Sequence, residues 1–234
     1  MEANFAAFET KAGLAFRDKA LLRQAFTHRS YINENKGSRL EHNERLEFLG
    51  DAVLELVVTN FLYFKYPSKP EGVLTTYRSA LVNSVTLAEV ASNLSMNDFL
   101  LLSKGEAKDT GRARQFILAN TFEAVVGAIY LDQGYDAAKA FIEKNIFVFA
   151  DKMIARGNLV DAKSQFQERA QEKTGTTPSY KLVKESGPDH DKSFTVAVMI
   201  GREQVATGEG KSKQEAEQNA ALRALEAKGW AAAE

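Results

Sequence analysis

Residues 42–57 constrain the fold of this chain most, because their sequence H-N-E-R-L-E-F-L-G-D-A-V-L-E-L-V sets Glu44, Glu47 and Asp51 into an otherwise apolar helical pattern. At about 100° per residue, these three side chains fall within an arc of roughly 60° on one helix face. Like charges at this spacing repel one another, and more so when partly buried. We therefore expect either basic side chains, Arg45 among them, or a hard divalent cation to neutralise the face. An ordinary solvated acidic face is the alternative.

Residues 116–131 repeat this design, with Asn120 and Glu123 at positions i and i+3 among apolar residues. Gly127, one turn after Glu123, would let another helix approach closely. If the two acidic helices pack together, their side-chain oxygens form a cluster of hard ligands, which suits Mg²⁺ or Mn²⁺. The members of this expected cluster are Glu44, Glu47, Asp51, Asn120 and Glu123.

Such ions activate water and clamp the oxygens of an in-line phosphoryl displacement. Paired carboxylates can also hydrolyse glycosides, but that chemistry needs two acids that flank a sugar cleft. Several oxygen donors on adjacent helices therefore favour a metal site.

The composition is that of a globular protein without thiol chemistry. The length of 234 residues indicates two domains, and 44% hydrophobic with 26% charged residues is typical of a soluble chain. The absence of Cys excludes disulfides, thiol nucleophiles and Cys-bound zinc, and it fits a reducing compartment. No apolar run reaches the length of a membrane span, and the N-terminus lacks the pattern of a secretory signal. We expect a cytoplasmic protein with no membrane partner.

The charge gives no argument for a nucleic-acid partner at the level of the whole chain. The formal net charge is −1, and basic and acidic residues nearly balance both in the first 160 residues and in the rest. A polyanion must therefore be bound by positive charge that is arranged locally.

The first 157 residues read as helices separated by polar turns. The expected helices are 4–11, one capped by Asp18, the acidic helix up to Pro67, 74–94, 116–131 closed by Gly134, and 137–155 capped by Asp136. The aromatic run at residues 61–66 predicts deep burial, against a second copy of the chain. Residues 104–114 form the expected mobile loop. His28 is a candidate ligand or base, but we interpret it as a structural histidine satisfied by backbone groups.

From residue 161 the pattern changes to a compact α+β module. A helix at 163–174 is followed by strand-like segments at 179–185, 194–200 and 203–210, and by an Ala-rich amphipathic helix at 212–228. The order α-β-β-β-α predicts helices packed on one face of an antiparallel sheet.

The motifs resemble those of the ribonuclease III family, bacterial endonucleases that cut double-stranded RNA. The signature is N-E-R-L-E-F-L-G-D at 43–51, supported by T-H-R-S at 27–30, P-x-x-x-E-G at 67–72 and E-A-x-x-G-A-x-Y-L-D at 123–132. The C-terminal module resembles a double-stranded-RNA-binding domain, with G-P-x-H at 187–190 and G-x-G-K-S-K-x-E-A-E at 208–217. The resemblance implies an all-α endonuclease domain at 1–157, a linker at 158–162 and a small α+β (α-β-β-β-α) RNA-binding domain at 163–229.

The resemblance also implies an Mg²⁺-dependent homodimer, with Mn²⁺ as a substitute, in which each nuclease domain cuts one strand of an RNA duplex. The expected products carry 5′-phosphate and 3′-hydroxyl ends with two-nucleotide 3′ overhangs, and structured RNA such as rRNA precursors is the expected substrate. By motif position, the catalytic residues are Glu44, Asp51 and Glu123, the metal residues are Glu47, Asn120 and Glu123, and Glu71 lines the RNA-cutting valley.

Asn120 departs from the family pattern, in which Asp is common at this position. An amide oxygen can still coordinate Mg²⁺, but the site loses one negative charge and should bind metal more weakly. We expect cleavage to survive at higher Mg²⁺; the alternative is an RNA-binding protein with weak or no cleavage.

The C-terminal module is expected to read A-form RNA by its shape, through minor-groove hydroxyls and phosphates. One face of its first helix offers Ser164, Gln167, Glu168 and Gln171, and His190 lies in a loop that would reach a second minor groove. Lys211, Ser212 and Lys213 precede the last helix, where free N–H groups and the helix dipole favour phosphate.

Overall fold

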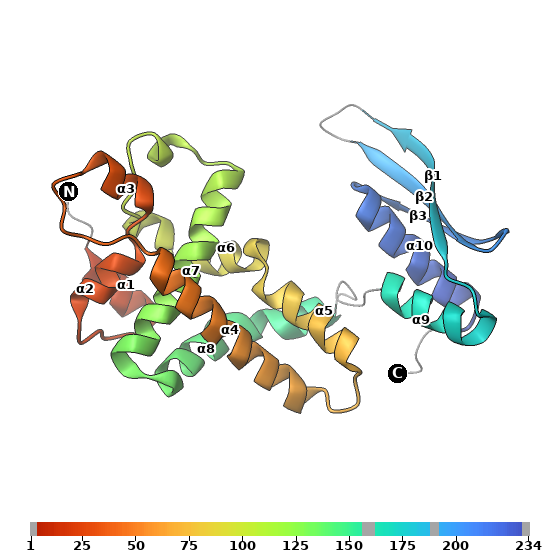
Figure 1. Cartoon of the computed structure of the whole chain (residues 1–234), viewed down its shortest axis with the longest axis horizontal. Helices are drawn as coiled ribbons and strands as arrows, with labels where there is room; N and C mark the ends of the chain where they lie inside the picture. Colours follow the sequence, from red (N-terminus) through yellow and green to blue (C-terminus); the bar gives the residue numbers. More distant parts are fainter. Residues whose placement is uncertain (1–3, 156–161, 188–191, 231–234) are drawn as a thin grey trace. The chain divides into compact units, whose positions relative to one another are not determined.

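The chain divides into two compact units, residues 1–159 and 160–234. The computed structural model describes residues 4–155, 162–187 and 192–230 (Figure 1). In these ranges, no helix is long and apolar enough to cross a membrane.

In residues 4–155 of the first unit, helices are the regular secondary structure, apart from one isolated bridge between Thr27 and Leu101, as expected from the sequence. Its helices are α1 (Phe5–Ala12), α2 (Lys19–Ala25), α3 (Arg29–Glu34), α4 (Glu44–Lys65), α5 (Glu71–Val82), α6 (Ser84–Asn93), α7 (Arg112–Gln133) and α8 (Tyr135–Ala155), with short 3₁₀ turns η1 (Met96–Phe99) and η2 (Glu106–Lys108). The turn η2 lies within the expected loop at 104–114.

Helix α7 forms the centre of this unit and packs against α2, α4, α6 and α8 (Figure 1). From Ile117 to Ile129, every residue is buried except Asn120 and Glu123, which are half-buried. A helix that is apolar on nearly all sides must lie in the core. The two polar residues therefore mark the stretch of α7 that opens toward a site.

Two glycines bring the backbones of α4 and α7 into direct contact. A Cβ atom on Gly50 would lie 1.8 Å from the carbonyl oxygen of Glu123, and one on Gly127 would lie 2.2 Å from the carbonyl oxygen of Leu46. The expected close approach at Gly127 is confirmed. This contact fixes which turns of the two acidic helices face each other.

Two expectations for the helical unit were wrong. The pattern at 74–94 is two helices, because Asn83 adopts an extended conformation and its side chain accepts a hydrogen bond from the Thr86 N–H at 2.9 Å, which caps α6. Asp136 lies in the first turn of α8 rather than at its cap. In the single chain, Tyr63 is 64% and Phe64 71% exposed, so the expected burial of the aromatic run at 61–66 against a second copy stays a prediction.

The second unit has the expected α-β-β-β-α order: α9 (Ala162–Thr174), β1 (Ser179–Ser186), β2 (Ser193–Ile200), β3 (Glu203–Gly210) and α10 (Lys213–Ala227). The three strands form an antiparallel sheet in the order β1-β2-β3, with β1 shifting register between Leu182 and Lys184. Helix α10 packs on β2 and β3, and α9 packs on α10.

The core of this unit is small and Ala-rich, which lets α10 lie close to the sheet. Phe166 of α9 is fully buried and stacks on Trp230, with ring centroids 5.7 Å apart. A Cβ atom on Gly208 would lie 2.1 Å from the backbone nitrogen of Ala220. Of the expected linker, residues 158–161 lie outside the described residues and Ala162 is the first residue of α9, so the domain boundaries stay predictions.

Candidate metal centre and RNA-binding surface

The N-terminal half of α4 carries the acidic face. Asn43 is buried and anchors the start of the helix, because its side-chain amide donates to the carbonyl of Ala25 at 3.1 Å. Glu44 and Glu47 lie in the first turn, where carboxylates interact favourably with the helix dipole. Asp51 is exposed one turn further along.

Glu44 is the one acid of this face with a basic partner in the described residues. Its Oε1 lies 3.2 Å from Nη1 of Arg29, and its Oε2 lies 3.8 Å from Nδ1 of His42. Arg45 is exposed, so the arginine that pairs with this face is Arg29 of the T-H-R-S segment and not Arg45.

Glu47 meets Asn120 where α4 and α7 cross. Burial raises the pKa of the Glu47 carboxyl, and the negative charges of Glu44 and Asp51 raise it further. The side-chain amide of Asn120 acts in the opposite direction by donating toward the Glu47 carboxylate. These two predicted metal residues are therefore neighbours across the helix pair.

The Glu123 carboxyl has a strongly raised pKa. Its pKa is raised to about 8, first by burial and then by the negative charges of Asp51, Glu47 and Glu55. Three carboxylates of α4 thus face one half-buried carboxylate of α7. A site of this kind holds more negative charge than neutral pH tolerates without a proton or a cation.

The oxygen donors do not form a closed cage of acidic ligands. In the part of the chain that the structure describes, no group of three or more His, Cys, Asp or Glu side chains has the geometry to hold a metal ion. Mg²⁺ does not need one, because it retains several waters and is held by one or two carboxylates together with substrate phosphates. The all-oxygen donor set and its uncompensated charge fit such an ion.

Glu55 is a further acidic residue whose charge acts on Glu123, and the sequence motifs did not indicate it. It lies four residues after Asp51 on α4, and its charge reaches Glu123. The i, i+4 spacing from Asp51 could have identified it, but it lies outside the signature at 43–51.

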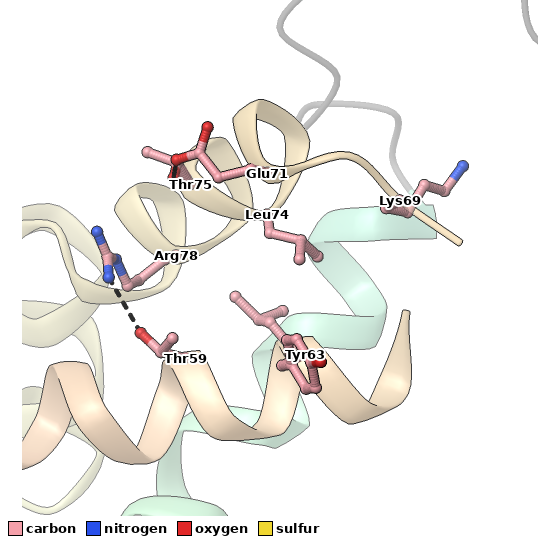
Figure 2. A pocket seen from close by; sticks show the side chains of 8 residues that line it. Thr59, Tyr63, Lys69, Glu71, Leu74, Thr75 and Arg78 are labelled. Carbon is pink, nitrogen blue, oxygen red and sulfur yellow. Dashed lines mark hydrogen bonds between the residues drawn. The ribbon is translucent and has the colours of Figure 1, made fainter. Parts of the chain in front are cut away.

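Glu71 lies away from this cluster, at the start of α5. It lines a pocket of about 390 Å³ between α4 and α5, together with Thr59, Tyr63, Leu74 and other residues (Figure 2). Its carboxylate accepts a hydrogen bond from the Thr75 hydroxyl at 3.0 Å. Glu71 is not among the charges that shift the pKa of Glu47 or Glu123.

His28 caps α3, which agrees with its interpretation as a structural histidine. Its Nδ1 accepts a hydrogen bond from the Ser30 N–H at 3.3 Å, and burial lowers its pKa. The backbone N–H of His28 donates a hydrogen bond to the backbone carbonyl of Leu101 at 3.1 Å. These bonds hold the segment that carries Arg29.

The predicted RNA-contacting residues of α9 share one surface. Ser164, Gln167, Glu168 and Gln171 are all exposed and fall on one face at helical spacing. His190 lies outside the described residues. Within the second unit, this polar helix face lies opposite the buried Phe166.

The start of α10 is exposed but differs in part from the expectation. Lys211, Ser212 and Lys213 are exposed, and Ser212 caps the helix by accepting from the Glu215 N–H at 3.1 Å. The Glu215 carboxylate in turn accepts from the N–H of Lys211, the residue before the cap, at 2.7 Å. Both of these N–H groups are therefore engaged within the chain.

A helical unit with an oxygen-rich acidic centre, joined to an α-β-β-β-α module, defines the class of two-domain nucleases that act on double-stranded RNA. A family model described as ribonuclease-III-like matches residues 18–149, and one for the double-stranded RNA binding motif matches residues 162–228.

Known proteins of the same family are similar to this chain over most of its length. Ribonuclease 3 of Enterococcus faecalis is 49% identical over 91% of this chain and 92% of its own length. Ribonuclease 3 of Geobacillus kaustophilus is 46% identical over 96% and 91%. The nuclease domain of ribonuclease III from Campylobacter jejuni, solved with a flexible region involved in dimer formation, is 41% identical with a TM-score of 0.55 and covers 61% of this chain and 98% of its own. The chain belongs to the ribonuclease III family, and it is an endoribonuclease of double-stranded RNA.

Proposed function

We propose that the chain cleaves RNA duplexes with Mg²⁺ held where α4 and α7 cross, by Glu47, Asn120 and Glu123. The observation that carries this proposal is the half-buried Glu123 facing three carboxylates of α4, which raise its pKa to about 8 together with burial. A divalent cation is the counter-charge that suits such a set of oxygens. Mn²⁺, with the same ligand preference, should substitute.

Bound there, Mg²⁺ would activate a water and neutralise charge on the scissile phosphate. Glu47 and Glu123 are the proposed direct ligands, and the Asn120 amide oxygen is the third. Glu44, Asp51 and Glu123 are the proposed catalytic residues, which orient the attacking water and keep the centre anionic. Arg29 holds the Glu44 carboxylate in place.

Asn120 makes the centre less negative than an Asp would. We therefore propose that the chain cuts RNA but needs more Mg²⁺ than a variant with Asp at this position. The second candidate function is a protein that binds double-stranded RNA and cleaves it weakly or not at all. The neutral side chain of Asn120 is the observation that favours it.

The active form is proposed to be a homodimer. Phe48, Leu56 and Tyr63 are 81%, 57% and 64% exposed and fall within an arc of roughly 80° on α4, with the exposed Ala52 between them. An exposed apolar stripe of this length favours a protein partner. Tyr63 also lines the Glu71 pocket, so a second copy on the stripe would lie beside Glu71.

Two centres in such a dimer would cut the two strands of one duplex and leave 5′-phosphate and 3′-hydroxyl ends with two-nucleotide 3′ overhangs. The exposed face of α9, His190 and the residues 211–213 are the proposed contacts to the duplex. Structured RNA such as rRNA precursors, in the cytoplasm, is the proposed substrate.

The first experiment uses a labelled RNA hairpin with the full chain, in Mg²⁺ and in Ca²⁺. We expect cleavage with Mg²⁺ but not with Ca²⁺, which prefers more ligands at longer distances, and we expect binding in both. End analysis should find 5′-phosphates. Binding without cleavage at any Mg²⁺ concentration would instead support the RNA-binding candidate.

A further inference from the structure

Arg29 forms an ion pair with Glu44 at the edge of the proposed metal centre. Nη1 of Arg29 lies 3.2 Å from Oε1 of Glu44, and this contact joins α3 to the start of α4 (Figure 1). The side chain of Arg29 is 64% exposed and that of Glu44 is 43% exposed. An ion pair with this exposure contributes little to stability. Stability alone therefore does not explain why an arginine is held at this place.

Hydrogen bonds fix the backbone on both sides of Arg29. The backbone carbonyl of Thr27 accepts a hydrogen bond from the backbone N–H of Asn43 at 2.9 Å, which ties the segment to the start of α4. On the other side, the hydroxyl of Ser30 accepts from the backbone N–H of Ser103 at 3.1 Å. The Arg29 side chain therefore starts from a fixed place beside the acidic face of α4.

The guanidinium of Arg29 retains hydrogen-bond donors for a ligand. It carries several N–H groups in a planar fork, and in the part of the chain that the structure describes its ion pair with Glu44 engages Nη1. The other donors lie on an exposed side chain. A guanidinium matches a phosphate group well, because its fork can form paired, charge-assisted hydrogen bonds to the phosphate oxygens.

The acidic centre needs such a positive group beside it. The carboxylates of α4 and α7 repel the phosphates of an approaching RNA strand. Arg29 is the arginine that pairs with this face. We propose that Arg29 binds a phosphate of the RNA strand next to the metal centre, while Glu44 holds its guanidinium in place. This inference rests on the proposed Mg²⁺ centre.

The first test measures binding of a labelled RNA duplex by the full chain in Ca²⁺, without cleavage. The proteins are native, Arg29→Gln, Arg29→Lys and the control Arg45→Gln. Arg45 is also exposed and follows Glu44 directly, but among the described residues it makes no ion pair. Arg29→Gln should weaken RNA binding about three- to tenfold and lower the slope of log Kd against log salt by about one, because one phosphate contact is lost. Arg45→Gln should stay within about twofold of native.

Arg29→Lys separates the charge of the side chain from its geometry. Lysine keeps the positive charge but lacks the planar fork that can contact a carboxylate and a phosphate together. We expect Arg29→Lys to restore the salt slope and only part of the affinity. Arg29→Gln should unfold close to the native temperature, because an exposed ion pair contributes little to stability.

Mn²⁺ binding shows whether Arg29 acts on the RNA or, through Glu44, on the metal. Electron paramagnetic resonance on the metal-free full chain, without RNA, measures this affinity. Arg29→Gln should bind Mn²⁺ at least as tightly as the native chain, because a positive charge is removed from the edge of the centre. Weaker Mn²⁺ binding with native RNA affinity would make Arg29 a positioning residue for the metal and overturn the phosphate contact.

Native RNA affinity and a native salt slope in Arg29→Gln would also overturn the inference, as would an equal loss in Arg45→Gln. Glu123→Gln, with the exposed Glu143→Gln on α8 as its control, distinguishes these results from failure of the centre. If Glu123→Gln loses Mn²⁺ binding and cleavage while Arg29→Gln binds RNA like the native chain, the centre stands and only the phosphate contact is wrong. If Glu123→Gln keeps both, the proposed centre itself is wrong.

Discussion

At the scale of single residues, one acid of the E-A-x-x-G-A-x-Y-L-D motif at 123–132 stabilises the fold. Asp132, the last residue of that motif, accepts the backbone N–H groups of Arg17 at 2.9 Å and Asp18 at 2.8 Å. Desolvation acts to raise the pKa of the Asp132 carboxyl, but these two hydrogen bonds, together with one from the Gln133 side chain and the charge of Arg17, hold the pKa below its ordinary value. Asp132 ties the residues before α2 to the end of α7.

Replacing Asp132 by Asn should destabilise the protein in a pH-dependent way. A carboxyl whose pKa is lowered by folding contributes stability above its unfolded pKa of about 3.9, and the contribution is lost as pH falls through the lower folded value. In urea unfolding at pH 7 and pH 5, Asp132→Asn should cost about 1–2 kcal/mol. The difference should shrink below about pH 4. The exposed Asp98→Asn is the control, and a pH-independent difference would contradict this account.

At the scale of elements, the α4–α7 crossing determines which residues can share a site. The acidic register of α4 could be predicted from helical periodicity, and Gly127 indicated a close helix contact. The partner glycine, Gly50, and the contribution of Glu55 could not, because they depend on which turns of two distant helices meet. The break at Asn83 could not be predicted for another reason: apolar residues continue on both sides, and the break is marked by a single residue whose side chain caps the start of α6.

Adding one methyl group at this crossing should separate the two helices. A Cβ atom on Gly50 would lie 1.8 Å from a backbone oxygen, so Gly50→Ala should lower the free energy of unfolding by about 1–3 kcal/mol or more. It should also weaken Mn²⁺ binding. Gly72→Ala in α5 is the matched control, since its Cβ would meet nothing within 4 Å and Ala favours helix. Equal stability of the two variants in urea would rule out a tight crossing.

At the scale of the whole molecule, the exposed stripe on α4 predicts the oligomeric state. Leu56→Arg should convert the proposed homodimer to single chains in sedimentation equilibrium at micromolar concentration, because a charge in an apolar interface is desolvated without a partner. Val148→Arg on α8 is the matched control, since Val148 is 56% and Leu56 57% exposed. Each variant should unfold like the native chain.

The dimer variant also tests how the two strands are cut. Single chains of Leu56→Arg should no longer cut the two strands of a duplex together. A Leu56→Arg protein that remains dimeric would show that the stripe is not the interface.

We propose that oxygen side chains of α4 and α7 hold the ion that cuts the RNA. The most direct measurement compares cleavage and binding of a labelled RNA duplex by native chain, Glu123→Gln and the control Glu143→Gln at saturating Mg²⁺. We expect Glu123→Gln to cleave slower by about two orders of magnitude or more while its RNA dissociation constant stays within about threefold. Cleavage by Glu123→Gln at the native rate would contradict the account.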